Sequence, residues 1–294
     1  MSLFFIGGIA ALLSAASWAL GAVLWRRIGE EISPFSMNLG KGIIGCLYLG
    51  IVLVVIGIEP VDLDSFLLLG ISGFLGITLG DTFFFMSLMH MGPRLASLMG
   101  TLTPVFIAIS AVIFLNESPS VMVWSGIVLT VGGVVWVLQE RLPRDKIIKN
   151  KSLGIQLGLL SVLFTTAGII LAKIGVASVP TVQATFIRLI CGVVGLVMWG
   201  MVNRQLKYWM IPFHNLQLLK SVAIVVFLIV FGGFWLSLFA LKYIDASIAG
   251  TLGSIGPLFM LPMAALLLKE RISSRAVLGA VITVSGIALI FINR

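Results

Sequence analysis

Three charged residues stand inside long apolar segments of the chain: Lys41, Asp81 and Arg188. Charge at the centre of a membrane helix costs at least about 2.5–3.5 kcal/mol, so each needs a partner or a task. Asp81 can take up a proton, and Lys41 can meet an anionic group. The fork of the Arg188 guanidinium suits a carboxylate or a phosphate. The simpler alternatives are a structural Lys41–Asp81 ion pair and an Arg188 that caps carbonyls or binds Glu117.

A candidate for a proton relay follows Asp81 along the same segment. His90 stands at the end of this segment, where an imidazole could pass protons between Asp81 and the aqueous phase. A histidine at the end of a span is more often simply solvated. The sequence leaves the relay and the solvated histidine both open. The predicted proton-coupling residues are Asp81 and His90.

The composition of the chain indicates that these charges lie in a membrane protein. The chain has 294 residues, of which 60% are hydrophobic and only 10% are charged. Soluble domains carry about 25% charged residues, so most of this surface must face lipid. Cys46 and Cys191 lie in apolar segments and are interpreted as small hydrophobic residues. Because no nucleophile–base or metal-ligand group gathers at one depth, we expect no enzyme, no metal and no cofactor.

Ten apolar segments are long enough to cross a bilayer, whose core of about 30 Å requires about 20 residues of helix. They are Leu3–Trp25, Pro34–Ile58, Phe66–Met89, Leu95–Leu115, Val121–Leu138, Leu153–Ala172, Pro180–Met201, Ser221–Leu241, Ala246–Leu268 and Ala276–Ile292. Lys41 and Asp81 then lie at similar depths, roughly 10 and 12 Å from one end of their spans.

The two halves of the chain repeat each other. Shifting the sequence by 153 residues lays Leu88–Gln139 over Leu241–Ile292 without a gap, and Ser14 matches Ser161 further upstream. Each half has five spans, and five is odd, so the second half must enter the membrane inverted. We therefore predict an all-α membrane protein with ten transmembrane helices in two inverted five-helix repeats around a central cavity. The repeats cover residues 1–139 and 153–294, and a basic hinge loop covers 140–152.

Matched helix breakers mark the predicted gates. Pro104 aligns with Pro257, and Gly100 aligns with Gly253. Each proline removes a backbone hydrogen bond in the middle of its span, and each glycine loosens the same turn. Matching breaks in two repeats are typical of transporter gates. Proline and glycine are also common in ordinary membrane helices, which is the simpler reading.

The basic residues predict the orientation. One side of the predicted bundle carries 14 Lys and Arg residues and the other carries three. The positive-inside rule places the 140–152 loop in the cytoplasm and both termini outside. The net charge of +8 then reflects orientation and contact with anionic lipid, so a nucleic-acid partner is not required. We expect the inner (plasma) membrane of a bacterium.

These features resemble the drug/metabolite transporter superfamily, specifically its EamA-type members. The resemblance rests on the two repeats, the matched prolines, the phrase Gly80–Asp81–Thr82 and the phrase Leu268–Lys269–Glu270–Arg271–Ile272. It implies a helix bundle around a central cavity that exports or exchanges small metabolites. The first half departs from the pattern, since Glu117 is followed by Ser118 where the family usually has arginine.

Trp18 and Trp235 complete the predicted solute site, because each lies within a span, away from the interfaces where tryptophans usually gather. They line a cavity or face lipid. The predicted substrate-binding set is Trp18, Lys41, Asp81, Thr82, Arg188 and Trp235. We expect a secondary active transporter that works by alternating access, is proton-coupled, and exports or exchanges a small metabolite or amino-acid-like solute. Its partners are the solute and the bilayer, and one chain suffices. The alternative is a flippase for a lipid-linked head group.

Overall fold

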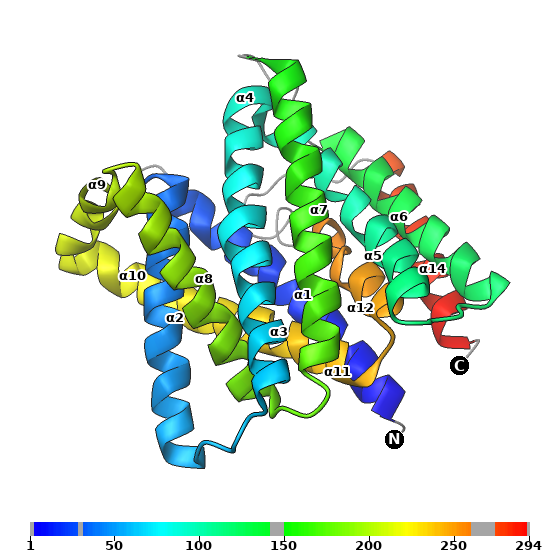
Figure 1. Cartoon of the computed structure of the whole chain (residues 1–294). Helices are drawn as coiled ribbons and strands as arrows, with labels where there is room; N and C mark the ends of the chain where they lie inside the picture. The colour runs from blue at the N-terminus through cyan, green and yellow to red at the C-terminus, as the bar shows by residue number, and fades with distance from the viewer. Residues whose placement is uncertain (1–2, 29–31, 142–149, 260–273, 293–294) are drawn as a thin grey trace.

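The computed structural model describes residues 3–28, 32–141, 150–259 and 274–292, and these residues form helices and short connections without any strand (Figure 1). The first half contains α1 (Leu3–Ile28), α2 (Pro34–Ile56), α3 (Leu63–Gly73), η1 (Phe74–Gly80), α4 (Asp81–Gly100), α5 (Leu102–Phe114) and α6 (Val121–Arg141). The second half contains α7 (Lys151–Gly175), α8 (Thr181–Val202), α9 (Leu206–Met210), η2 (Ile211–His214), α10 (Leu216–Phe227), η3 (Leu228–Trp235), α11 (Leu236–Tyr243), α12 (Ala246–Gly253) and α14 (Ser274–Ile292).

Within these described ranges, seven helical stretches are long and apolar enough to cross a membrane. One of them joins α3, η1 and α4 over Leu63–Met91, and another joins α10, η3 and α11 over Leu216–Tyr243. Three shorter apolar helices, Leu102–Phe114, Ala246–Phe259 and Val277–Ile292, fall in the predicted spans four, nine and ten. Most of the hinge loop, the end of predicted span nine and the phrase Leu268–Ile272 lie outside the described residues.

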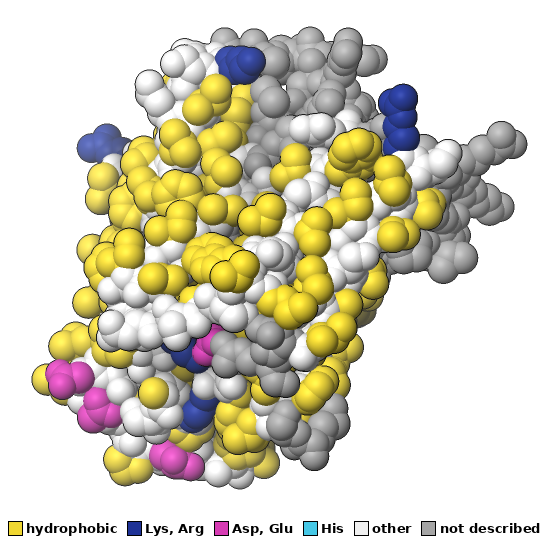
Figure 2. All heavy atoms as spheres, turned by 90° about the vertical axis from the view of Figure 1, so that its right-hand side faces the viewer, with side chains coloured by type: hydrophobic (Ala, Val, Ile, Leu, Met, Phe, Trp, Pro, Cys, Tyr) yellow, Lys and Arg dark blue, Asp and Glu magenta, His cyan; other side chains and the backbone are white. Residues whose placement is uncertain are grey.

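The outside of the bundle is apolar. Val54 and Val121 each leave 83% of their surface uncovered, and hydrophobic side chains spread over the face that Figure 2 shows, with acidic side chains gathered toward one end. Such a surface is stable only in an apolar solvent. It is the surface of an integral membrane protein.

Polar residues at the ends of the apolar stretches fix where several helices begin. The Ser33 side chain accepts from the Ser36 amide ahead of Pro34, which occupies the first turn of α2. Asp62 Oδ2 accepts from the Ser65 amide at 2.8 Å and so caps α3. Asn150 Oδ1 caps α7 through the Leu153 amide at 3.0 Å. The caps satisfy amides that a helix leaves open at its first turn.

The helices break at the glycines of the predicted gates and not at the prolines. α4 ends at Gly100 and α12 ends at Gly253, each four residues before its proline, rather than at Pro104 and Pro257 in the middle of a span. Proline has no N–H for the carbonyl four residues before it, and glycine adds its own entropic cost to helix formation at that carbonyl. The two halves therefore break at matched positions. α4 also continues through residues 90–94, where the sequence predicted a loop.

Glycines bring α6 and α14 into close contact side by side (Figure 1). A Cβ atom placed on Gly126 would lie 2.8 Å from the Gly286 carbonyl oxygen, and one on Gly133 would lie 2.7 Å from that of Gly279. Under the 153-residue shift, Gly126 matches Gly279 and Gly133 matches Gly286. The contacts are therefore crossed, which is the pattern that a two-fold axis between two equivalent helices produces.

A carboxylate and an ammonium tie the turn between α11 and α12 to neighbouring elements. Glu117 accepts from the Ala246 amide at 2.5 Å and from the Ser247 amide and hydroxyl at 3.2 and 2.6 Å. Lys173 Nζ donates to the carbonyls of Leu241 and Ile244, both at 2.7 Å. Negative charge at a helix start and positive charge at a helix end are both favourable. The carboxylate of Glu117 thus caps α12, and the suggested Arg188–Glu117 contact is not made.

Candidate functional site

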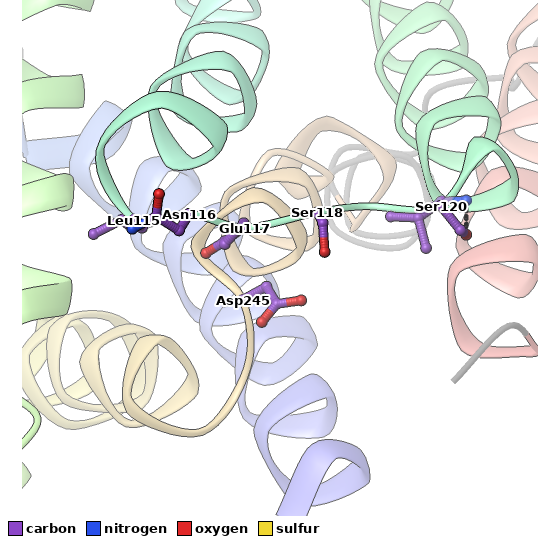
Figure 3. Close-up of a pocket in the computed structure, with 7 residues that line it drawn as sticks. Leu115, Asn116, Glu117, Ser118, Ser120 and Asp245 are labelled. Carbon is purple, nitrogen blue, oxygen red and sulfur yellow. Dashed lines mark hydrogen bonds between the residues drawn. The ribbon is translucent and has the colours of Figure 1, made fainter.

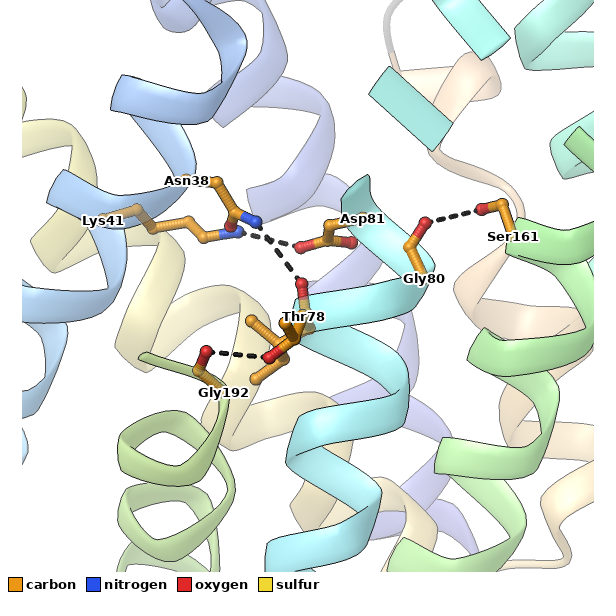
Figure 4. Close-up of polar contacts among 8 residues, drawn as sticks. Asn38, Lys41, Thr78, Gly80, Asp81, Ser161 and Gly192 are labelled. Atoms are coloured by element: carbon orange, nitrogen blue, oxygen red, sulfur yellow. Dashed lines mark hydrogen bonds and ion pairs between the residues drawn. The ribbon is translucent and has the colours of Figure 1, made fainter. Parts of the chain in front are cut away.

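The structure brings Lys41 and Asp81 together. Lys41 Nζ on α2 lies 3.4 Å from Asp81 Oδ2 at the first residue of α4 (Figure 4). The Lys41 side chain is 9% exposed, whereas that of Asp81 is 35% exposed. The lysine is therefore enclosed, and the carboxylate keeps an open face. This ion pair forms between two spans, as the similar predicted depths of the two residues suggested.

Two aromatic rings lie beside the ammonium. Lys41 Nζ lies 5.1 Å from the ring centre of Phe234 in η3 and 6.0 Å from that of Trp18 on α1. The two rings meet edge to face, with their centres 4.8 Å apart. A cation within about 6 Å of a ring face gains cation–π attraction, which is stronger away from water. We call Trp18, Lys41, Asp81 and Phe234 the charged-aromatic cluster.

A π-helical stretch, η1, places Asp81 at its end. π-helical turns alter the hydrogen-bond ladder and are frequent at functional sites. Asn38 Nδ2 on α2 donates to the Ile77 carbonyl at 3.4 Å, and Thr78 Oγ1 donates to the Gly192 carbonyl on α8 at 2.9 Å (Figure 4). These bonds fix η1 between α2 and α8, and with it the position of Asp81.

Two matched hydrogen bonds join the halves next to the cluster. Ser161 Oγ on α7 donates to the Gly80 carbonyl, and Ser14 Oγ on α1 donates to the Gly233 carbonyl, both at 2.8 Å. Gly80 and Gly233 are repeat partners, and so are Ser14 and Ser161. Each π-helical stretch, η1 or η3, is therefore held by the first helix of the other half.

A cavity of about 180 Å³ opens beside Asp81, between α4, α5 and α7. Its polar lining comes from Asp81, Thr103, Ser161 and Thr165, and Gly100 lines it at the break between α4 and α5. We call it the α4–α5–α7 cavity. Asp81 thus contacts the ammonium of Lys41 and also borders a small polar space.

Comparison with known proteins identifies the chain. The model of the EamA-like transporter family matches residues 5–139 and again residues 152–292. The chain belongs to the EamA-like transporter family. Its members are transporters, so the two matches agree with two related units in one membrane transporter.

A solved structure, described only as a crystal structure of a protein, has the same fold as this EamA-like transporter. It is 17% identical, the match covers 99% of this chain and 97% of that chain, and the TM-score is 0.74. At this identity the likeness concerns the fold alone. The search of curated proteins found no match.

Arg188 of the transporter lies on α8 against η1. A Cβ atom placed on Gly76 would lie 3.8 Å from Arg188 Nη2, so the guanidinium reaches along the π-helical stretch. Its Nε is buried and has no hydrogen-bond partner among the described residues. The acidic residue within electrostatic reach is Asp81. The sequence did not pair Arg188 with Asp81, since their proximity depends on the packing of α8 beside η1.

The other predicted residues lie apart from the cluster. Trp235 Nε1 donates to Thr181 Oγ1 at 2.9 Å, which holds the indole at the start of α8. Thr82 is fully buried, and its Oγ1 has no hydrogen-bond partner in the described part of the chain. His90 follows Asp81 by nine residues, about 13.5 Å along α4. Its carbonyl accepts from the Asn150 amide at 3.2 Å, and its buried Nδ1 has no partner in the described ranges.

Sequence reasoning missed Phe234 and Asn38. A signal for Phe234 existed, since the 153-residue shift aligns it with Asp81. The two repeat partners occupy the same cluster from opposite halves. Asn38 precedes Lys41 by three residues, so both face the same side of α2.

A second pocket of about 430 Å³ lies away from the cluster, where the loop between α5 and α6 meets the start of α12 (Figure 3). Leu115, Asn116, Glu117, Ser118, Ser120, Val123 and Asp245 line it. It contains none of the predicted site residues. The Glu117 carboxylate caps α12, so its role in this pocket is structural.

Proposed function

We propose that this chain is a secondary active transporter of the bacterial inner membrane, which exports or exchanges a small amino-acid-like solute by alternating access. Proton exchange at Asp81 drives the cycle. The observation that carries the proposal is the Lys41–Asp81 ion pair within membrane-spanning helices, with the rings of Trp18 and Phe234 beside its ammonium.

Charge balance favours a zwitterionic solute. Breaking a buried ion pair leaves an uncompensated charge and is strongly unfavourable. A cationic solute at Asp81 would leave Lys41 without its partner, and an anionic solute at Lys41 would leave Asp81 with only the guanidinium of Arg188 within electrostatic reach. A zwitterion that enters between them pairs its carboxylate with Lys41 and its ammonium with Asp81, while the two aromatic rings contact its apolar part.

Protonation of Asp81 supplies the coupling. A neutral Asp81 no longer holds the ammonium of Lys41 electrostatically, so the state of this carboxyl group biases the cluster between a closed pair and an open site. In this proposal Arg188 stabilises the Asp81 carboxylate from α8, Thr82 follows it in the chain, and His90 relays protons between Asp81 and the cytoplasm. Gly100, Pro104, Gly253 and Pro257 form the gates in this proposal.

The contacts between the halves support ten spans in two inverted five-helix repeats, 1–139 and 153–294, joined by the hinge at 140–152. The crossed glycine contacts of α6 with α14 and the matched serine–carbonyl bonds are both two-fold patterns. An inverted pair of units rocks around a fixed central site. The hinge lies in the cytoplasm and both termini lie outside, with a single chain as the working unit.

The flippase alternative gains no specific observation from the described residues. Lys41, which would have held a lipid phosphate, is enclosed and paired with Asp81.

Binding by matched solutes tests the charge argument. Purified protein is heated with phenylalanine, with its cationic amide and with its anionic N-acetyl derivative, and alanine and leucine series are run beside it. A ligand that binds the folded state raises the apparent stability. We expect a zwitterion to give the largest upward shift of the melting temperature and Lys41→Met to remove it. Equal shifts from all three charge forms would contradict the argument.

Transport tests the coupling. Sealed vesicles with the wild-type protein should move the zwitterion found by the binding screen faster when a pH gradient is imposed. Asp81→Asn should abolish the response to the gradient. Asp64→Asn, at an exposed acid in the first turn of α3, is the matched control and should behave as wild type. An unchanged pH response in Asp81→Asn removes Asp81 from the coupling.

A further inference from the structure

Asp81 faces two environments from the end of η1. Its Oδ2 pairs with Lys41 at 3.4 Å, and Figure 4 shows its second carboxylate oxygen pointing away from the lysine. The same residue lines the α4–α5–α7 cavity. The cluster side is occupied by an ammonium and two rings. The cavity side offers hydroxyl groups and open volume.

The cavity has the size and the polarity that water requires. About 180 Å³ is room for several waters at about 30 Å³ each, provided that each finds two to four polar partners. Thr103, Ser161 and Thr165 supply hydroxyl groups. Asp81 lines the same cavity and adds carboxylate oxygens to its polar wall.

We propose that the α4–α5–α7 cavity holds water and is the place where Asp81 exchanges its proton, separate from the charged-aromatic cluster where the solute binds. This rests on the proposed function and adds the route of the coupling proton. A hydronium in the cavity gives its proton to the Asp81 carboxylate and remains as water. The reverse step returns the proton to a cavity water and restores the ion pair with Lys41.

The charged groups around Asp81 lie on the solute side and not on the cavity side. Lys41 approaches from α2, and Arg188 lies within electrostatic reach from α8. The cavity-lining residues of α5 and α7 contribute no titratable group. Water is therefore the proton carrier on the cavity side.

The repeat gives the cluster a carboxyl group in only one of its two equivalent positions. Phe234 stands where the second half would carry a partner of Asp81, and it binds no proton. The structure thus gives one proton-exchanging carboxyl group in the cluster for the two halves. We expect one proton for each transport cycle.

Hydroxyl-radical footprinting tests whether the cavity is wet, because radicals formed from bound water oxidise the nearest side chains. Met99 and Phe84 line the cavity, whereas Met91 lies fully buried in the core of the same helix and serves as the internal reference. Met99 should be oxidised and Met91 should not. Equal oxidation of Met99 and Met91 would overturn the proposal.

A filled cavity tests the proton route. A Cβ atom placed on Gly100 meets nothing within 4 Å, so Gly100→Leu puts its side chain into open space. Gly132 is an equally open position on α6, and Gly132→Leu is the control. The carboxyl stretch in the infrared, assigned with Asp81→Asn, is followed after a pH jump. We expect Gly100→Leu to slow protonation about tenfold, which corresponds to about 1.4 kcal/mol of barrier.

A milder variant keeps the test independent of folding. Thr103→Val removes one cavity hydroxyl at nearly constant side-chain volume. It should slow the protonation of Asp81, followed by the same infrared band, while zwitterions still raise the melting temperature. Unchanged protonation rates in both cavity variants would refute the route. Because neither readout involves transport, a failure here is distinct from a failure of the proposed transport activity.

Discussion

The α6–α14 contact makes a sharp prediction for Gly133→Ala. A Cβ atom at Gly133 would lie 2.3 Å from Thr283 Oγ1 and 2.7 Å from the Gly279 carbonyl oxygen, whereas ordinary contact begins at 3.4 Å. The hydroxyl can rotate away, but the carbonyl belongs to backbone. The helices must therefore separate by about 0.7 Å, the difference between 3.4 and 2.7 Å.

Overpacking of this kind costs about 1–3 kcal/mol. At roughly 2–4 °C for each kcal/mol in chains of 150–250 residues, the melting temperature should fall by about 2–12 °C. The neighbouring Gly132 is the control, because its added Cβ meets nothing within 4 Å. Gly132→Ala should be neutral or stabilising by about 0.4–1 kcal/mol through the unfolded chain.

Thermal unfolding in detergent, followed by tryptophan fluorescence, measures both variants. If Gly133→Ala and Gly132→Ala have the same melting temperature, the close α6–α14 contact does not exist in solution. The crossed two-fold pattern would then lose its strongest support. A drop confined to Gly133→Ala supports the packing described above.

Two further predictions concern charged groups. Lys41→Met should lower the melting temperature, because losing one partner of a buried pair costs about 3–5 kcal/mol, and less here since Asp81 is partly exposed. The double variant with Asp81→Asn should recover part of the loss, and strictly additive effects of the two substitutions would count against a coupled pair. Asp62 makes a pH prediction: the Ser65 amide and hydroxyl hold the pKa of its carboxyl below the usual value. Its cap therefore stabilises above that usual pKa and is lost as the pH falls through the lowered one. Asp62→Asn should weaken the dependence of the melting temperature on pH in that acid range. An unchanged dependence on pH would contradict the cap.

The sequence predicted the parts of this site that depend on charge and repetition. Lys41 and Asp81 pair because both are charges at one depth. The repeat matched Gly126 with Gly279 and Gly133 with Gly286, and the structure adds that these glycines contact each other across the two halves. The sequence did not predict that Phe234, rather than Trp235, joins the cluster. Neighbouring residues on a helix point about 100° apart, and the π-helical stretch η3 shifts the facing side without any signature in residue type.

Helix ends were also less predictable than helix positions. The prolines correctly indicated interrupted spans, but the break depends on the carbonyl four residues earlier, which is why Gly100 and Gly253 end their helices. The place of Arg188 beside η1 depends on tertiary packing of α8, which no single segment encodes.

The serine–carbonyl bonds also constrain how the chain is assembled during synthesis. The acceptor at Gly80 enters the membrane 81 residues before its donor at Ser161 has been made. Until α7 is inserted, the turn before Asp81 lacks its hydrogen bond from Ser161. η3 must then pack against α1, which was inserted much earlier, to accept the hydrogen bond from Ser14. Each half therefore supplies a hydrogen-bond donor that the other half needs, and we expect these two bonds to form only after both halves have been inserted.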